Sequence, residues 1–325
     1  MRQTDFGGML GSALGSVRGS VLGFGCGSVL GRVGRSASLR AMGCAWEEGI
    51  TVFDTARSYG FGEAEGVLGE FLRGKREQAV VMTKFGILPQ RQSALTKAAM
   101  PVVRAAMKVP GARKVLRRGG GAAAHGEFTV PGLRASLEES LRQLQTEYVD
   151  VLFLHEASPG ALRQEDLWEE LAKLVQAGKV RQVGLYGELS VVAAGLAAGL
   201  GMGAMQFGAD AFDPVAAGFG REVLLVANHP FGGEARVARV MAALGEMAGD
   251  PTVPEGLREK LRGGDWAMVT EAIFGMALRR ADALVLSMMR EDHVRENVRA
   301  VEKGRFTDGE LEILMERMLG TELRG

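Results

Sequence analysis

The chain has 325 residues, of which 46% are hydrophobic and 24% charged, the balance of a water-soluble globular protein. Lys and Arg together number 39, as do Asp and Glu, and the zero net charge argues against a nucleic-acid partner and against a polybasic membrane anchor. The two cysteines, Cys26 and Cys44, have neither a metal-ligand spacing nor a disulfide framework, so we expect a cytoplasmic protein.

Two stretches bear on targeting and on membranes. Asp5 and frequent glycines interrupt the N-terminal region, which therefore lacks the continuous apolar core of a signal peptide. The uncharged stretch 189–209 is long enough to span a bilayer, but it is rich in Ala and Gly and no basic cluster flanks it. We interpret it as a buried helix followed by a buried strand, with membrane insertion as the minor alternative.

In the first half of the chain, short apolar runs alternate with segments of helical periodicity. A glycine-rich region, 7–35, contains the apolar run 21–25, and Ser36 is predicted to cap a helix that ends at Glu48. Next come a strand at 50–54, a helix at 63–72 and a strand at 79–84. Residues 86–128 are basic and contain several prolines, so they are predicted to form a long inserted loop. Within it, 96–108 is a candidate helix.

The alternation continues to the C-terminus. The predicted helices are a segment that opens at Thr129 or Pro131 and ends at 144, then 165–177, 189–198, a short one after Asp213-Pro214, 234–280 with a break at 251–254, 291–301 and 308–319. The predicted strands are 148–155, 179–185, 204–207, 222–227 and 283–287.

Eight short apolar strands that alternate with helices predict a parallel sheet covered on both faces. At this length they favour a closed (β/α)₈ TIM barrel, in one domain over 1–325, with an insert after strand three and additional C-terminal helices. An open dinucleotide-binding sheet would carry G-x-G-x-x-G after its first strand. Gly25-Cys-Gly27 begins that pattern, but Leu30 stands at its third glycine position.

Four chemically reactive residues follow three consecutive predicted strands. Asp54 ends strand two and Tyr59 lies in the loop after it, Lys84 ends strand three, and His155 ends strand four. Each has an ordinary structural interpretation, such as a turn carboxylate, a solvated lysine or a core histidine. The ends of parallel barrel strands meet at one rim, however, and four coincidences at that rim are improbable.

The four residue types suit protonation of a carbonyl oxygen while another group attacks the carbon. A phenol has a pKa of about 10 and serves as a general acid near neutral pH if a cation lowers that value. Lys84 is the predicted cation, Asp54 its counter-ion, and His155 a group that binds or orients the substrate oxygen. No Glu-x-x-His or His-x-x-x-His pattern occurs, so no metal site is predicted.

These residues resemble the aldo-keto reductase family. The resemblance lies in residues 49–56 with Tyr59-Gly60 and Glu65, and in residues 80–86, 140–155, 178–184 and 296–297. It implies that Asp54, Tyr59, Lys84 and His155 are the catalytic tetrad and that Tyr59 gives a proton to the carbonyl oxygen during hydride transfer. It also implies a nicotinamide cofactor, usually NADPH with NADH possible, and a small-molecule carbonyl substrate.

The resemblance further implies a set of cofactor-binding positions, several of which depart from the family pattern. They are Gly25, Asp54, Tyr186, Gln206, Asn228, Ser287, Arg290, His293 and Asn297. Tyr186-Gly187 stands where the family usually has Ser-Asn, and Ser287-Met288 where it has Lys-Ser. His229 or Tyr186 is the candidate for a missing stacking aromatic, and Arg290 for a missing phosphate ligand.

The altered cofactor positions leave a second hypothesis open. The chain can be a non-catalytic or regulatory barrel that binds the nucleotide and acts through a partner. The basic stretch 113–118 in the insert is a candidate contact for such a partner, although a solvated loop face is the simpler interpretation. Of the two hypotheses, we expect the chain to be an enzyme.

Overall fold

The computed structural model describes residues 1–6, 18–31, 33–89, 128–209, 211–212 and 223–322. Within them, parallel strands form a closed barrel in the order β10-β3-β4-β5-β6-β7-β8-β9. The strands are β3 (Leu22–Gly25), β4 (Val52–Asp54), β5 (Val80–Phe85), β6 (Val149–His155), β7 (Val180–Tyr186), β8 (Ala204–Gly208), β9 (Leu224–Asn228) and β10 (Ala283–Leu286). The predicted TIM barrel and its eight strands are confirmed.

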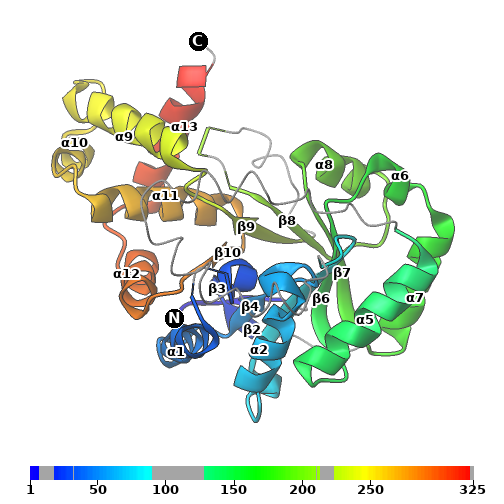
Figure 1. Cartoon of the computed structure of the whole chain (residues 1–325). Helices are drawn as coiled ribbons and strands as arrows, with labels where there is room; N and C mark the ends of the chain where they lie inside the picture. The colour runs from blue at the N-terminus through cyan, green and yellow to red at the C-terminus, as the bar shows by residue number, and fades with distance from the viewer. Residues whose placement is uncertain (7–17, 32, 90–127, 210, 213–222, 323–325) are drawn as a thin grey trace, which may run out of the picture.

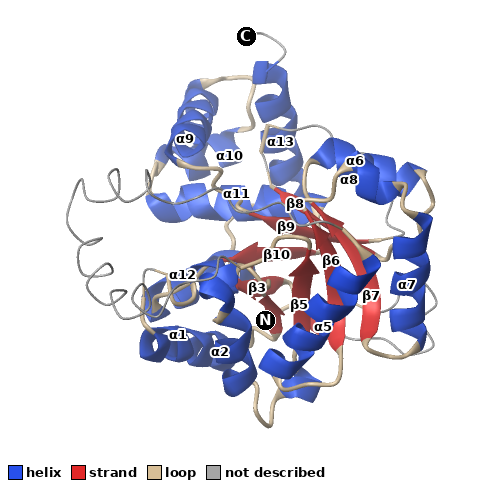
Figure 2. Cartoon of the chain, turned by 45° about the vertical axis from the view of Figure 1, so that its right-hand side comes forward, coloured by secondary structure: helices blue, strands red, loops and turns tan. Residues whose placement is uncertain are grey.

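Helices surround the barrel on the outside (Figure 2). Among the described residues, those before β8 are α1 (Arg35–Glu47), α2 (Ala64–Phe71), α5 (Val130–Leu144), α6 (Pro159–Leu162), α7 (Glu165–Gln176) and α8 (Leu189–Ala197). The others are α9 (Glu234–Gly249), α10 (Glu255–Arg262), α11 (Trp266–Arg280), α12 (Glu291–Glu302) and α13 (Asp308–Glu322). Figure 1 shows α9, α10, α11 and α13 gathered on one side of the barrel, with α5 and α7 on the other.

The N-termini of α1 and α5 and the burial of α8 bear on three of the helix predictions. The prediction that Ser36 caps α1 is wrong: the extended residue Gly34 is the cap, and Ser36 lies in the first turn because the helix begins one residue earlier. Of the two alternatives for α5, Thr129 is confirmed, since its hydroxyl accepts a hydrogen bond from the Gly132 N–H at 3.2 Å. The helix in the uncharged stretch is only nine residues long and half-buried rather than buried, with just Val192 and Gly195 inside.

No helix among the described residues is long and apolar enough to cross a membrane. Most of the predicted insert at 86–128, including the candidate helix at 96–108, lies outside the described residues, as does Asp213-Pro214.

An N-terminal hairpin, which the sequence analysis did not predict, covers the N-terminal end of the barrel. Strand β1 (Gln3–Asp5) pairs antiparallel with β2 (Arg18–Ser20), and β2 leads almost directly into β3. Phe6, only 3% exposed, packs with the side chains inside the barrel. The barrel interior is therefore closed at this end, and ligands reach it from the C-terminal rim.

The barrel interior is filled with apolar side chains, which confines polar chemistry to the rim. Its inward-facing residues include Val52, Val80, Met82, Val151, Phe153, Leu224, Val226 and Val285. The Phe153 ring crosses to β7, where a Cβ on Gly184 would lie 2.6 Å from it. Glycine is therefore required at 184, because any side chain there would overlap the ring.

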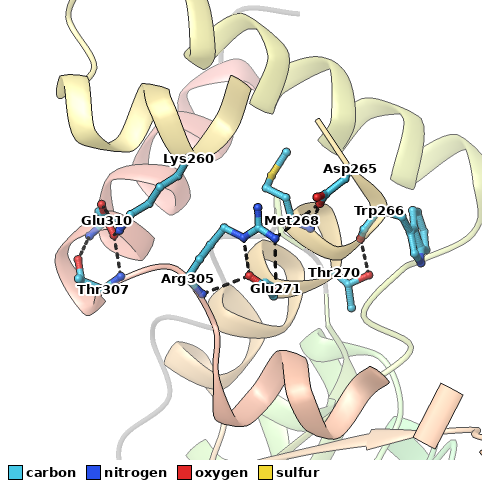
Figure 3. Close-up of polar contacts among 9 residues, drawn as sticks. All are labelled: Lys260, Asp265, Trp266, Met268, Thr270, Glu271, Arg305, Thr307 and Glu310. Carbon is cyan, nitrogen blue, oxygen red and sulfur yellow. Dashed lines mark hydrogen bonds and ion pairs between the residues drawn. The ribbon is translucent and has the colours of Figure 1, made fainter. Parts of the chain in front are cut away.

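The C-terminal region 234–280 has a second break that the sequence analysis missed. Gly264, in a left-handed conformation, ends α10, and Asp265 then caps α11 by accepting a hydrogen bond from the Met268 N–H at 2.6 Å. Partly buried ion pairs connect these helices to the C-terminal part of the chain: Lys260 binds Glu310 at 2.7 Å, and Arg305 binds Glu271 at 2.6 Å (Figure 3). The additional C-terminal helices are thus an integral part of the barrel wall.

Candidate active site

The four residues predicted to be catalytic converge at the C-terminal rim. Asp54 and His155 are the last residues of β4 and β6, Lys84 lies near the end of β5, and Tyr59 begins a 3₁₀ turn, η2 (Tyr59–Gly62), after β4. Asp54, Lys84 and His155 are 3%, 1% and 5% exposed. Their side chains face the same space because alternate residues of parallel strands point inward at matching levels.

Lys84 and Asp54 form a buried ion pair. The Lys84 Nζ donates to Oδ1 and Oδ2 of Asp54 at 2.6 and 2.7 Å and to the Thr55 carbonyl oxygen at 3.0 Å. Asp54 Oδ1 also accepts from the Gln206 Nε2 at 3.2 Å. An ammonium has three donors, and all three are satisfied here. The positive charge is therefore neutralised within the site, as burial of two ions requires.

Tyr59 lies beside this pair, and its pKa departs from the sequence-based expectation. The Lys84 Nζ is 5.0 Å from the centre of the Tyr59 ring. Burial, followed by the negative charge of Asp54, raises the pKa of Tyr59 well above its ordinary value. The expectation that Lys84 lowers this pKa is wrong for this structure, because Asp54 neutralises the cation and leaves desolvation as the main effect. The phenol is accordingly protonated at neutral pH.

His155 is a neutral imidazole. Burial and the positive charge of Lys84 lower the pKa of His155 to about 3. Its Nδ1 is buried and has no hydrogen-bond partner among the described residues. A neutral imidazole carries one N–H donor and one acceptor, so His155 can donate a hydrogen bond to an oxygen without carrying charge.

Four residues that were not assigned roles from the sequence shape the loop that carries Tyr59. Glu65, 1% exposed in α2, accepts from Arg57 of the loop at 2.8 Å and from the Thr83 hydroxyl of β5 at 2.7 Å. Gly60, directly after Tyr59, has a φ of 56°, and a Cβ there would lie 2.9 Å from the Val29 carbonyl oxygen. The family resemblance included Gly60, Glu65 and Thr83 without giving them a role, and nothing local in the sequence links Arg57 or Thr83 to Glu65.

A pocket of about 480 Å³ opens beside the four residues. It is lined by residues that end or follow β6, β7, β8 and β9, namely Glu156, Ala157, Tyr186, Gly187, Glu188, Gly208, Asn228 and His229. Nearby, Gln206 Oε1 and Asn228 Oδ1 are buried acceptors with no partner among the described residues. Such acceptors are costly unless a ligand satisfies them, so the rim is built to receive N–H or O–H groups. Glu156 and Glu188 were missed from the sequence.

The positions predicted to bind a cofactor fall into two groups. Gly25, Asp54, Tyr186, Gln206, Asn228 and Ser287 all lie at the rim, in or directly after their strands. The Ser287 hydroxyl donates to the Gly25 carbonyl oxygen at 3.3 Å, which links β10 to β3. Gln206 and Asn228 carry the unpartnered acceptors, and they fit a primary amide such as that of nicotinamide.

The second group belongs to α12: Arg290 is its N-cap, His293 lies in its first turn and Asn297 near its middle. Arg290 is the N-cap residue, and its guanidinium binds both carboxylate oxygens of Asp292. Glu291 and Asp292 place two acids in the first helical turn. The guanidinium predicted to bind phosphate is thus already neutralised by its own helix.

The sequence of the chain is similar to those of known oxidoreductases. Residues 21–189, just over half of the chain, match the model of the aldo/keto reductase family. The chain is 29% identical over 161 residues to the aldo-keto reductase YhdN of Bacillus subtilis, an alignment that covers 49% of this chain and 39% of that protein. It is 33% identical over 144 residues to a D-threo-aldose 1-dehydrogenase of Pseudomonas sp, covering 43% and 41%.

A third relative, the L-galactose dehydrogenase of Arabidopsis thaliana, is 30% identical over 166 residues, covering 50% of this chain and 41% of that protein. The chain thus spans about two fifths of the length of the curated relatives that it matches.

Solved structures share the fold over nearly the whole chain. The holo form of the aldo-keto reductase AKR11C1 from Bacillus halodurans superposes with a TM-score of 0.66 at 22% identity and covers 98% of this chain and 96% of its own. An aldo-keto reductase from Klebsiella pneumoniae, solved in complex with NADPH, has a TM-score of 0.62 at 18% identity and covers 93% and 92%.

Proposed function

Because this chain belongs to the aldo/keto reductase family, we propose that it reduces an aldehyde or ketone to an alcohol with a nicotinamide cofactor, or catalyses the reverse oxidation. The observation that carries this proposal is the protonated phenol of Tyr59 beside the buried Lys84–Asp54 pair and the neutral His155. The names of the relatives, which include dehydrogenases of an aldose and of L-galactose, support oxidoreduction of small polar carbonyl compounds.

The rim residues fit the proposed cofactor. Gln206 and Asn228 would hold the carboxamide through their free acceptors, with Gly25, Asp54, Tyr186 and Ser287 around it. Arg290, His293 and Asn297 would face the phosphate-bearing half. When bound, the nicotinamide supplies the hydride. The NADPH complex of the Klebsiella pneumoniae structure supports NADPH as the cofactor, with NADH as the alternative.

The residues of the chain then handle the oxygen atom of the substrate. His155 donates a hydrogen bond to the carbonyl oxygen and orients it, because its imidazole is neutral. Tyr59 transfers its proton to that oxygen as negative charge develops there, which leaves the phenolate facing the Lys84 ammonium. Arg57, Glu65 and Thr83 hold the Tyr59 loop against β5, so the phenol keeps its place throughout.

An absorbance assay of NADPH and NADH consumption with a panel of aldehydes, including aldoses, tests the proposal. We expect turnover with at least one aldehyde and saturable binding of one reduced cofactor. Binding of the cofactor without turnover of any aldehyde would favour the regulatory barrel instead. A protein that neither bound a cofactor nor turned over any aldehyde would contradict both hypotheses.

A second prediction concerns the choice between NADPH and NADH. In Asp292→Asn, the Arg290 guanidinium loses its counter-ion and one carboxylate leaves the first turn of α12. We expect the affinity for NADPH, relative to that for NADH, to rise about fivefold to tenfold, because only NADPH carries a 2′-phosphate. Titration of tryptophan fluorescence with each cofactor measures both dissociation constants.

The matched control is Asp308→Asn, which removes an acid from the first turn of α13, where it pairs with Arg279 at 3.3 Å. That substitution should leave the ratio of the two affinities unchanged. An equal effect of Asp292→Asn on NADH and NADPH would show that α12 does not meet the 2′-phosphate.

A further inference from the structure

Two tyrosine side chains share the same pair of neighbours at the rim. The Lys84 Nζ lies 5.0 Å from the ring centre of Tyr59 and 5.6 Å from that of Tyr186. The His155 ring lies 6.0 Å from Tyr59 and 5.1 Å from Tyr186, edge-on to both. The imidazole and the ammonium thus neighbour two phenols, of which the sequence analysis assigned only Tyr59 a role in proton transfer.

The position of Tyr186 follows from the barrel register. Tyr186 ends β7 and is paired with His155 of β6 on one side and with Gln206 of β8 on the other. Its ring packs against the apolar residues inside the barrel, so it points inward. The next inward residue below it is Gly184, over which the Phe153 ring lies, and the ring of Tyr186 stands beside His155 at the rim.

The Tyr186 hydroxyl is available to a ligand. No hydrogen bond to it is formed by any residue that the structure describes, and the residue is half-buried. Tyr186 also lines the pocket of about 480 Å³, together with Asn228 and Glu188, whereas Tyr59 does not. A ligand that occupies this pocket therefore lies against Tyr186, whose ring neighbours the same imidazole and ammonium as Tyr59 does.

We propose that Tyr186 is a second catalytic phenol, whose hydroxyl donates a hydrogen bond to the carbonyl oxygen while Tyr59 transfers the proton. This inference rests on the proposed reduction of a carbonyl compound. Two donors at one oxygen stabilise the charge that develops there better than one donor does. Tyr186 only shares a hydrogen bond, so no additional proton acceptor is needed.

The test uses the full chain labelled with ¹³C at the Cζ atoms of its three tyrosines, assigned with Tyr→Phe variants. Tyr148 is the internal reference, because it precedes β6 at the opposite end of the strand and lies between Arg76 and Arg181 at 4.0 and 4.3 Å. The probe is butanal added to the protein with NADP⁺, which has no hydride to transfer. We expect the Tyr59 and Tyr186 resonances to shift with butanal and the Tyr148 resonance to stay.

Kinetics of Tyr186→Phe provide the second measurement. This variant keeps the ring beside His155 and removes only the hydroxyl, so kcat should fall about tenfold to a hundredfold while cofactor affinity and thermal midpoint stay unchanged. The pKa of His155 should remain at about 3 in an NMR titration of the imidazoles, which shows that the ring contact survives.

The outcomes separate this inference from the proposed function. A shift of Tyr59 alone, with an unchanged kcat in Tyr186→Phe, would overturn the role of Tyr186 and leave the reductase in place. A lower kcat accompanied by a raised His155 pKa would also overturn it, since the effect would then come from packing. If wild-type protein neither bound NADP⁺ nor responded to butanal, the proposed function itself would fail.

Discussion

Tyr59→Phe is expected to lower kcat for aldehyde reduction by about a thousandfold, because it removes the proton donor from the reacting oxygen. The ring remains, so its contacts with Lys84 at 5.0 Å and with His155 at 6.0 Å should persist. Cofactor affinity and stability should therefore be unchanged. Single-turnover kinetics with the reduced cofactor, compared between wild type and variant, measure the effect on the chemical step.

The matched control is Tyr148→Phe, in which the phenol removed lies at the opposite end of β6. It should keep the wild-type kcat. A Tyr59→Phe variant that retained most of its activity would contradict the assignment of this residue as the donor.

The same assay has an expected pH profile. Burial raises the pKa of Tyr59 well above its ordinary value and, with Lys84, lowers that of His155 to about 3. Tyr59 therefore stays protonated and His155 neutral over the accessible range, and kcat for reduction should vary little between about pH 5 and pH 9. A loss of activity below a midpoint of about 6.5, the unperturbed value for histidine, would show that His155 is solvated during turnover.

Lys84→Met is expected to lower the free energy of unfolding by about 3–5 kcal/mol and to abolish turnover. Lys84 is 1% exposed and provides the only cationic partner of Asp54 among the described residues. Its removal leaves a buried carboxylate that keeps a single side-chain hydrogen bond, from Gln206 at 3.2 Å. Urea denaturation measures the change in stability.

Two further variants identify the cause of that loss. Adding Asp54→Asn to Lys84→Met should restore much of the stability without activity, because the unpaired charge is removed. Lys303→Met, at the exposed C-terminal end of α12, should change stability by no more than about 0.5 kcal/mol. Equal losses in the Lys84→Met single variant and in the double variant would show that packing, and not the unpaired charge, dominates.

The barrel and the meeting of four reactive residues were predictable from the sequence, for reasons that are local. Apolar runs of strand length mark β3 to β10, and a residue at the end of a parallel barrel strand lies at the C-terminal rim whatever its partners are. Asp54, Lys84 and His155 end or nearly end three consecutive strands, so their proximity follows from chain order alone. Boundaries set by backbone geometry were less predictable, as Ser36 shows: Gly34 caps α1 without using a side chain.

Only the tertiary structure decided the electrostatics of the site and the position of Tyr186 beside His155. Whether Lys84 lowers the pKa of Tyr59 depends on how completely Asp54 neutralises the ammonium. Asp54 does so through contacts of 2.6 and 2.7 Å with the Lys84 Nζ, which lies on a different strand. Tyr186 reaches the same imidazole and ammonium because β6 and β7 pair in one particular register. The sequence by itself therefore determined which residues reach the rim. The distances and burial that set their charge states arise only when segments far apart in the chain pack together.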